Sequence, residues 1–314
     1  MRLLITGDTG LLGHALAAES LENQSYEIFG VSRSALGSWA DWNHRALDLT
    51  DPAATLGYLD EIRPDFIIHC AAATDVDQCE TQQVRAWMIN IDATERLAQW
   101  TARNGVRFTF VSTDSVFDGT QGGYCEGDLP RPLNHYARTK LAGEQAAAWW
   151  CPDSLIVRTS FYGLNARGRP NLAKWMYGKL ACAEPLRAFV DVRFSPLFVS
   201  DAAKLILELI SRDAKGIFHV GAAESCSKYE FAVLLARELH CETGRIQPIL
   251  LKEFPSGARR PKNTSLAVGK CAQFLGRGMP TMEQGLRAFA RTIAGHKSVP
   301  FQKSAVQSVE LTSR

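Results

Sequence analysis

Thr6-Gly7-Asp8-Thr9-Gly10-Leu11-Leu12-Gly13 (TGDTGLLG) lies between a short apolar run, Leu3–Ile5, and a segment of helical periodicity, Leu11–Leu21. The pattern predicts a strand, a tight turn and a helix. Glycines let a backbone turn tightly and approach a pyrophosphate closely. The start of the helix then presents free N–H groups and the positive end of its dipole to the phosphates. The spacing G-x-x-G-x-x-G indicates a dinucleotide-binding loop, and the alternative is a turn that only packs the helix on the strand.

Outward from this loop, short apolar runs alternate with helical patterns over the first 160 or so residues. Such alternation predicts an α/β fold with a doubly wound, mainly parallel, Rossmann-like sheet, because right-handed crossovers place the helices on both faces. Ligands of these sheets bind beyond the carboxyl ends of the strands. The predicted strands are Arg2–Thr6, Tyr26–Ser32, Arg45–Leu47, Asp65–Cys70, Val106–Ser112 and Leu155–Arg158, and the helices include Leu11–Leu21, one that begins after Asp51-Pro52, Val84–Asn104 and Asn134–Trp150.

The pattern changes after about residue 163, at a loop over Leu164–Pro170. We expect a dinucleotide-binding domain over 1–163, with 195–222 packing back on it. Segments 164–194 and 223–294 would form a smaller, mostly helical substrate-binding region, and 295–314 a flexible tail. In this part helices are predicted over Leu172–Ala183, Ser200–Ser211 (capped by Ser200 or Asp201), Ser227–His240 and Met282–Ile293, and a strand over Lys215–Val220.

The end of the second predicted strand, Val31-Ser32-Arg33-Ser34, indicates the kind of dinucleotide. A carboxylate at this point would bind the ribose 2′-hydroxyl of NAD, and none is present. Arg33 can instead pair with a 2′-phosphate. The sequence therefore favours NADPH, with NADH as the alternative.

Tyr136 and Lys140 stand four residues apart in the predicted helix Asn134–Trp150. Residues at this spacing lie on one face of a helix, side by side. A cation beside a phenol favours the phenolate and lowers a pKa that is ordinarily about 10. The pair therefore predicts a proton donor for a carbonyl group.

Composition excludes several classes of protein. The chain has 314 residues, 46% of them apolar, and a net charge of +2, which gives no reason to expect nucleic acid or an anionic membrane as a partner. The eight cysteines include no C-x-x-C pair and no zinc spacing, as in a reduced, cytoplasmic protein. Asp75, Asp77 and Glu80 are interpreted as carboxylates at a helix N-terminus, and no metal site is predicted.

Seven segments together resemble the extended short-chain dehydrogenase/reductase superfamily and, within it, the dTDP-4-dehydrorhamnose reductase family. The resemblance covers roughly residues 1–292. The segments are TGDTGLLG (6–13), ALDLTD (46–51), HCAAATDVDQCE (69–80), VSTDSVFDG (111–119), YCEGDLPRPLNHYARTKLAGE (124–144), VRTSFYG (157–163) and RRPKNTSLAVGKC (259–271).

The resemblance implies roles for particular residues. Tyr136 would give a proton to the substrate carbonyl, Lys140 would lower its pKa and hold the nicotinamide ribose, and Thr113 would bond the carbonyl oxygen. The cofactor would be held by Gly7, Thr9, Gly10, Leu11, Leu12 and Gly13 at the pyrophosphate, Asp48 and Leu49 at the adenine, and Ala71, Ala72 and Ala73 along the groove. Substrate contacts would come from Thr74, Asp114, Ser115, Phe161, Arg260 and Asn263.

The implied activity is reduction of a nucleotide-linked 4-keto-6-deoxy sugar, with a homodimer as an expected assembly. Ser115 and Phe161 depart from the family pattern, which usually has an aromatic residue and a tryptophan at these positions, so the sugar does not follow. The alternatives are an NAD-dependent epimerase or dehydratase of nucleotide sugars, and a regulatory subunit that binds a dinucleotide without catalysis.

Overall fold

The computed structural model describes residues 1–22, 26–34, 41–164, 171–254 and 257–295. The predicted tail, beyond Gly295, and residues 165–170 of the predicted loop lie outside these ranges.

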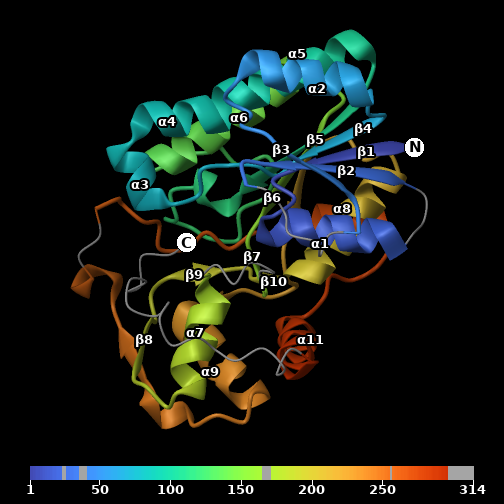
Figure 1. Ribbon diagram of the computed structural model, residues 1–314. Helices are drawn as coiled ribbons and strands as arrows, with labels where there is room; N and C mark the ends of the chain where they lie inside the picture. Colours follow the sequence, from blue (N-terminus) through green and yellow to red (C-terminus); the bar gives the residue numbers. More distant parts are fainter. Residues whose placement is uncertain (23–25, 35–40, 165–170, 255–256, 296–314) are drawn as a thin grey trace.

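A seven-stranded parallel sheet forms the upper half of the molecule in Figure 1 and confirms the predicted α/β class. The strand order β11-β6-β5-β4-β1-β2-β3 places β1, which carries the glycine-rich loop, inside the sheet. Its residues Leu3–Thr6 are buried, as expected of a strand that is covered on both faces. The strands are β1 (Arg2–Thr6), β2 (Glu27–Ser32), β3 (Asn43–Ala46), β4 (Phe66–His69), β5 (Arg107–Thr113), β6 (Leu155–Thr159) and β11 (Gly216–Val220).

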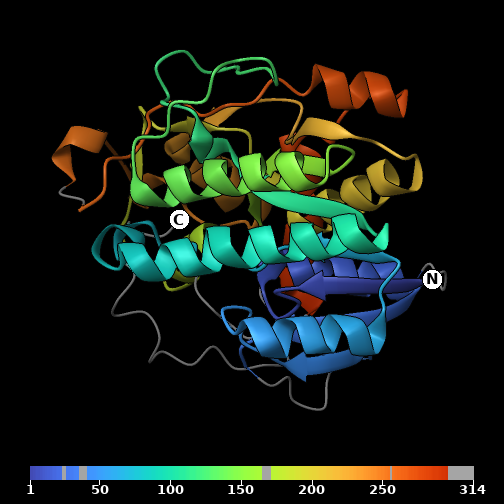
Figure 2. The ribbon, with the colours of Figure 1, turned by 90° about the horizontal axis from the view of Figure 1, so that it is seen from above.

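Helices cover both faces of the sheet (Figures 1 and 2). On one face α1 (Leu11–Glu22) packs against α8 (Val199–Ser211). On the other lie α2 (Pro52–Ile62), α5 (Ala93–Asn104) and α6 (His135–Trp150). The predicted helix Val84–Asn104 is divided, because a π-helical turn over Met88–Asp92 separates α4 (Gln83–Trp87) from α5.

Side-chain caps explain where several helices begin. Asp51 accepts a hydrogen bond of 3.0 Å from the Ala54 amide and precedes Pro52, so α2 begins where the sequence predicts. Asn134 accepts a hydrogen bond of 2.9 Å from the Ala137 amide and caps the start of α6 in the same way. The cap predicted for α8 is wrong: its N-cap is Phe198, which makes no side-chain cap, and apolar burial of the helix supports it instead.

The lower part of the molecule is built from later segments and is mostly helical (Figure 1). Three two-stranded sheets, β7 with β10, β9 with β12 and β8 with β13, tie these segments together. The elements are β7 (Phe161–Tyr162), α7 (Leu172–Ala181), β8 (Leu186–Phe189), β9 (Arg193–Phe194), β10 (Leu197–Phe198), β12 (Cys226–Ser227), α9 (Lys228–Glu238), β13 (Ile246–Ile249) and α11 (Met282–Gly295). The short helix α3 (Val76–Thr81) belongs to the upper part, and α10 (Gly269–Leu275) packs against β11 of the large sheet.

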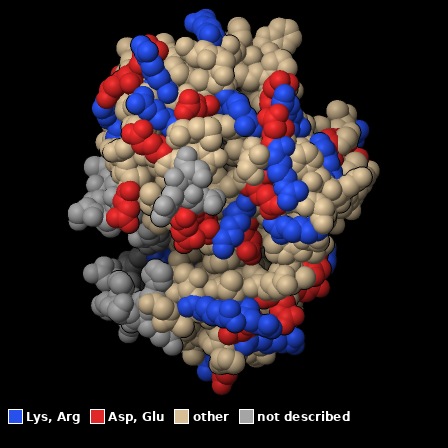
Figure 3. Space-filling view, turned by 90° about the vertical axis from the view of Figure 1, so that its right-hand side faces the viewer, with Lys and Arg blue, Asp and Glu red and all other residues tan. Residues whose placement is uncertain are grey.

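One hydrophobic core continues from the sheet into the lower part, since it includes Leu3 and Ile5 of β1 together with Phe194 and Phe231. This shared core fixes the lower part beneath the carboxyl ends of the strands. On the face seen in Figure 3, basic and acidic side chains are interspersed. In the described part of the chain, we find no helix with both the length and the apolar character that crossing a bilayer requires.

Candidate active site

A cavity of about 700 Å³ lies where β1, β4, β5 and β6 end, and the lower part of the molecule closes it. This is the position at which parallel α/β sheets bind ligands. The cavity wall brings together most of the residues that the sequence singles out: Gly7, Thr9, Gly10, Leu11, Leu12, Gly13, Arg33, Asp48, Leu49, Ala71, Ala72, Thr74, Thr113, Asp114, Ser115, Tyr136, Phe161 and Arg260.

The glycine-rich loop is shaped so that another backbone can approach it closely. Gly7 has φ +70°, a conformation that side chains disfavour, and a Cβ added there would lie 2.8 Å from the Ala71 nitrogen. The Gly10 amide donates a hydrogen bond of 2.8 Å to the Gly7 carbonyl, and this bond closes the turn before α1 begins. This compact turn and the open N-terminus of α1 fit the pyrophosphate of a dinucleotide.

Arg33 and Asp48 both line the same cavity. Burial would raise the pKa of Asp48, but hydrogen bonds from Thr50 and the positive charges of Arg33 and Arg85 hold it below its ordinary value. Ser32 donates a hydrogen bond of 3.0 Å to the Ser34 carbonyl and so shapes the turn that carries Arg33. A guanidinium presented in this way fits a phosphate on the adenosine ribose.

Tyr136 and Thr113 both line the cavity. Tyr136 lies in the first turn of α6, behind the Asn134 cap, and Thr113 is the last residue of β5. Burial raises the pKa of Tyr136, and its interaction with the Thr113 side chain works in the opposite direction. The expected lowering of this pKa by Lys140 is therefore not found, because burial is the dominant effect.

Lys140 lies behind the cavity wall. Its Nζ donates a hydrogen bond of 2.7 Å to the carbonyl of Val111 and lies 4.0 Å from the centre of the Phe110 ring. Burial lowers the pKa of Lys140 to about 8, and the negative charge of Glu144 opposes the change. Val111 itself lines the cavity, so the Lys140 ammonium is held by a residue of the cavity wall.

Ala73 and Asn263 also lie outside the wall formed by the described residues. The Ala73 amide donates a hydrogen bond of 2.8 Å to Oδ1 of Asn90, and this bond fixes the backbone that follows β4. Asn263 accepts hydrogen bonds from the amide and the hydroxyl of Ser265, at 3.2 and 2.7 Å. Both residues thus hold loops that border the cavity.

Asp114 is the centre of a buried hydrogen-bond network beside Thr113. Its Oδ1 accepts from the hydroxyls of Thr113 and Ser115, at 3.2 and 3.3 Å, and its Oδ2 accepts from Thr264 at 2.6 Å. Burial raises the pKa of Asp114, and these hydrogen bonds oppose the rise. The network attaches the end of β5 to the C-terminal segment that contains Arg260.

The acidic cluster at the start of α3 has structural partners. Asp75 is the N-cap of α3 and accepts a hydrogen bond of 3.0 Å from the Gln78 amide. This agrees with the interpretation of the cluster as carboxylates at a helix N-terminus. Asp77 forms an ion pair of 2.8 Å with Arg260, and Glu80 accepts a hydrogen bond of 2.6 Å from the His135 amide at the start of α6. The Asp77–Arg260 pair crosses from the sheet half to the lower half of the cavity.

The sequence interpretation missed much of the lower wall. Trp175 and Met176 of α7, Phe189 of β8, and Arg193 and Phe194 of β9 all line the cavity, as does Lys228 at the start of α9. These residues come from separate segments that are brought together only by the tertiary fold. The serine at 227, which caps α9, was a visible signal for the position of Lys228.

Comparison with known proteins places this geometry in a family. The family model described as RmlD substrate binding domain matches residues 1–294. A probable low-salt glycan biosynthesis reductase, Agl14, of Haloferax volcanii is 32% identical over 304 residues, which cover 95% of this chain and 100% of that protein. Methionine adenosyltransferase 2 subunit beta of Xenopus laevis is 35% identical, over 86% of this chain and 81% of its own length.

Among solved structures, a dTDP-4-dehydrorhamnose reductase from Bacillus anthracis, determined in complex with NADP, superposes with a TM-score of 0.83. It is 32% identical and covers 93% of this chain and 99% of its own. The resemblance found in the seven sequence segments is thus confirmed over nearly the whole chain. The protein belongs to the RmlD substrate binding domain family.

Proposed function

We propose that this protein is an NAD(P)H-dependent reductase that acts on the keto group of a nucleotide-linked 4-keto-6-deoxy sugar, with NADPH as the preferred cofactor. The observation that carries the proposal is that Tyr136 and Thr113, whose side chains interact, stand in the wall of the same cavity as the glycine-rich loop. Relatives named as reductases of dTDP-linked sugars and a related structure with NADP support it.

The residues of the chain would each hold one part of the reacting system. The N-terminus of α1 and the turn at Gly7 would hold the pyrophosphate, and Arg33 the 2′-phosphate. The bound cofactor supplies a hydride to the carbonyl carbon. Thr113 would orient the carbonyl oxygen, and Tyr136 would transfer its phenolic proton to that oxygen, to be replenished from solvent.

The elevated pKa of Tyr136 keeps the phenol protonated before reaction. Proton transfer needs a phenolate that is stabilised as it forms. Lys140 is a buried cation four residues after Tyr136 on the same helix, and it can supply this stabilisation. We propose that the Lys140 ammonium exchanges its contact with Val111 for one with the nicotinamide ribose, which would bring its charge toward Tyr136.

The test is oxidation of the reduced cofactor with a panel of dTDP- and UDP-linked keto sugars, run with NADPH and with NADH, followed by identification of products by NMR. The proposal predicts stoichiometric loss of NADPH and a new secondary alcohol at C4. An epimerase or dehydratase would change the sugar without net consumption of reduced cofactor, and that result would contradict the proposal.

The match to methionine adenosyltransferase 2 subunit beta favours a second candidate, a regulatory subunit that binds a dinucleotide and a partner enzyme. A binding protein of this kind has no need of a proton donor, whereas Thr113, Tyr136 and Lys140 are all present. Absence of turnover with every keto sugar, together with tight binding of NADPH, would support this second candidate.

A further inference from the structure

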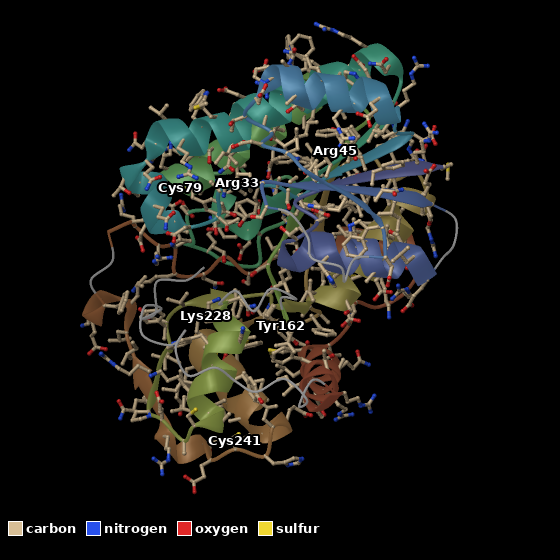
Figure 4. All side chains as sticks on the ribbon, in the orientation of Figure 1. Arg33, Arg45, Cys79, Tyr162, Lys228 and Cys241 are labelled. Atoms are coloured by element: carbon tan, nitrogen blue, oxygen red, sulfur yellow. The ribbon has the colours of Figure 1, made fainter. Side chains whose placement is uncertain are left out.

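Lys228 stands in the lower wall of the cavity as the first residue of α9, directly after the Ser227 cap. Figure 4 shows it in the lower half of the molecule, below the level of Arg33. Its Nζ lies 3.1 Å from the centre of the Phe194 ring. Toward the residues that the structure describes, this nitrogen makes neither a hydrogen bond nor an ion pair within 4 Å.

Two effects of the surroundings act on the charge of Lys228 in opposite directions. Burial lowers the pKa of Lys228 to about 8, and the nearby carboxylate of Asp114 opposes the change. The oxygens of Asp114 are already engaged by the hydroxyls of Thr113, Ser115 and Thr264. An ammonium carries three N–H donors, and at this half-buried place in the cavity wall an anionic ligand can accept hydrogen bonds from them.

The other cations of the lower wall are occupied. Arg193 pairs with Glu230 at 3.1 Å and donates to the Ser225 carbonyl, and Arg260 pairs with Asp77 at 2.8 Å. Arg33 belongs to the cofactor end of the cavity, next to Asp48. Among the described residues, Lys228 is therefore the cation of the lower wall that is left to meet an anionic ligand.

The position of Lys228 selects one part of a substrate. Asp114, which follows Thr113, acts on the charge of Lys228, and the same lower wall also includes the aromatic residues Phe194, Phe189 and Trp175. An aromatic wall fits a nucleoside base, and the sugar must reach Tyr136. The diphosphate joins these two parts of a sugar nucleotide. We propose that Lys228 binds the diphosphate of the substrate, an assignment that rests on the proposed function.

The test measures equilibrium binding of dTDP and of UDP to protein saturated with NADPH, so that the cofactor site is filled. Lys228→Met removes the charge and keeps the length of the side chain, and Lys228→Arg restores a cation. Lys270→Met is the matched control. Lys270 lies on α10, outside the cavity wall, and its Nζ also stands over a phenylalanine ring, 4.2 Å from the centre of Phe218.

The proposal predicts that Lys228→Met weakens binding of the nucleoside diphosphate by about 10- to 100-fold. Lys228→Arg would recover most of this loss, Lys270→Met would change the dissociation constant by less than about twofold, and all three variants would bind NADPH as the wild type does. With a reducible keto sugar, Lys228→Met would raise KM much more than it lowers kcat.

Equal binding of dTDP and UDP by wild type and Lys228→Met would overturn the assignment, and so would failure of the wild type to bind either. The two proposals fail separately. If the wild type reduces a keto sugar and Lys228→Met has an unchanged KM, the diphosphate site is wrong and the reductase stands. If dTDP binding depends on Lys228 and no keto sugar is reduced, the anion site stands and the reductase is wrong.

Discussion

The hydroxyl of Thr264 donates a hydrogen bond of 2.6 Å to Oδ2 of Asp114, a residue 150 positions earlier in the chain. Asp114 follows Thr113 at the end of β5, and Thr264 belongs to the segment that carries Arg260. One short contact therefore joins the sheet half of the cavity to its lower wall. Both residues are buried, so the contact replaces water at a carboxylate that has few other donors.

Thr264→Val should remove this donor while preserving the shape of the side chain. A hydrogen bond to a charged group is worth about 1.5–3 kcal/mol, so the free energy of unfolding should fall by about that amount. Urea unfolding measures the loss. Thr264→Ser keeps the hydroxyl and serves as control, and equal stability of the Val and Ser variants would show that the contact is not stabilising.

Arg33→Ala should reduce the preference for NADPH over NADH. Loss of a guanidinium that pairs with the 2′-phosphate should raise the KM for NADPH by about 10- to 100-fold, with little change for NADH. Arg45 provides the control, since it is an exposed arginine on the neighbouring strand β3 that pairs with Glu61 (Figure 4). If Arg45→Ala and Arg33→Ala had the same effect on the ratio of the two KM values, a specific role of Arg33 would be contradicted.

His69 should make the protein less stable in acid. In the folded protein burial lowers the pKa of His69 to about 3, and the charge of Lys140 adds to this, whereas the ordinary value is 6.5. The unfolded chain therefore binds a proton below pH 6.5 that the folded protein excludes, and the free energy of unfolding falls as the pH is lowered from 6.5 toward 3.

Between pH 7 and pH 5 the contribution of His69 to this loss is about 2 kcal/mol. His69→Gln retains polar atoms that can face Thr6 and Thr94, the present partners of the ring at 2.6 and 3.0 Å. Denaturant unfolding at the two pH values should show a smaller loss in the variant. An identical pH dependence in both proteins would show that His69 does not titrate as described.

Sequence reasoning reached the features that local chemistry determines. The loop at Gly7 needs a positive φ, and Asp51 and Asn134 cap the helices that follow them, so each of these sites is visible in a few adjacent residues. The alternation of apolar runs predicted the parallel sheet for the same reason. Only the boundaries moved, by one or two residues at most strand ends.

Features that depend on distant segments were not predicted. The pattern Val84–Asn104 contains nothing that distinguishes the π-helical turn at Met88–Asp92 from regular helix. The start of α8 at Phe198 is set by burial and not by Ser200 or Asp201. Lys228 enters the cavity wall because β9 and β12 pair at Phe194 and Cys226, a contact between segments about 30 residues apart.

The spacing of Tyr136 and Lys140 predicted a shared helix face, and both residues do lie on α6. It did not predict that Lys140 would donate to Val111, because the carbonyl at that position belongs to β5 and is brought near by the fold. A pattern within one helix can specify which side chains are neighbours, but their hydrogen-bond partners depend on the strand beneath.

The most direct measurement compares wild type with Tyr136→Phe in the oxidation of NADPH by dTDP-4-keto-6-deoxyglucose, alongside NADPH binding. The control is Tyr58→Phe, at a buried tyrosine of α2 outside the cavity wall. Removal of the phenolic proton should lower kcat by about 10²- to 10⁴-fold, while the dissociation constant of NADPH and the activity of Tyr58→Phe stay close to the wild-type values. A Tyr136→Phe protein that turns over at the wild-type rate would contradict the assignment of Tyr136 as the acid.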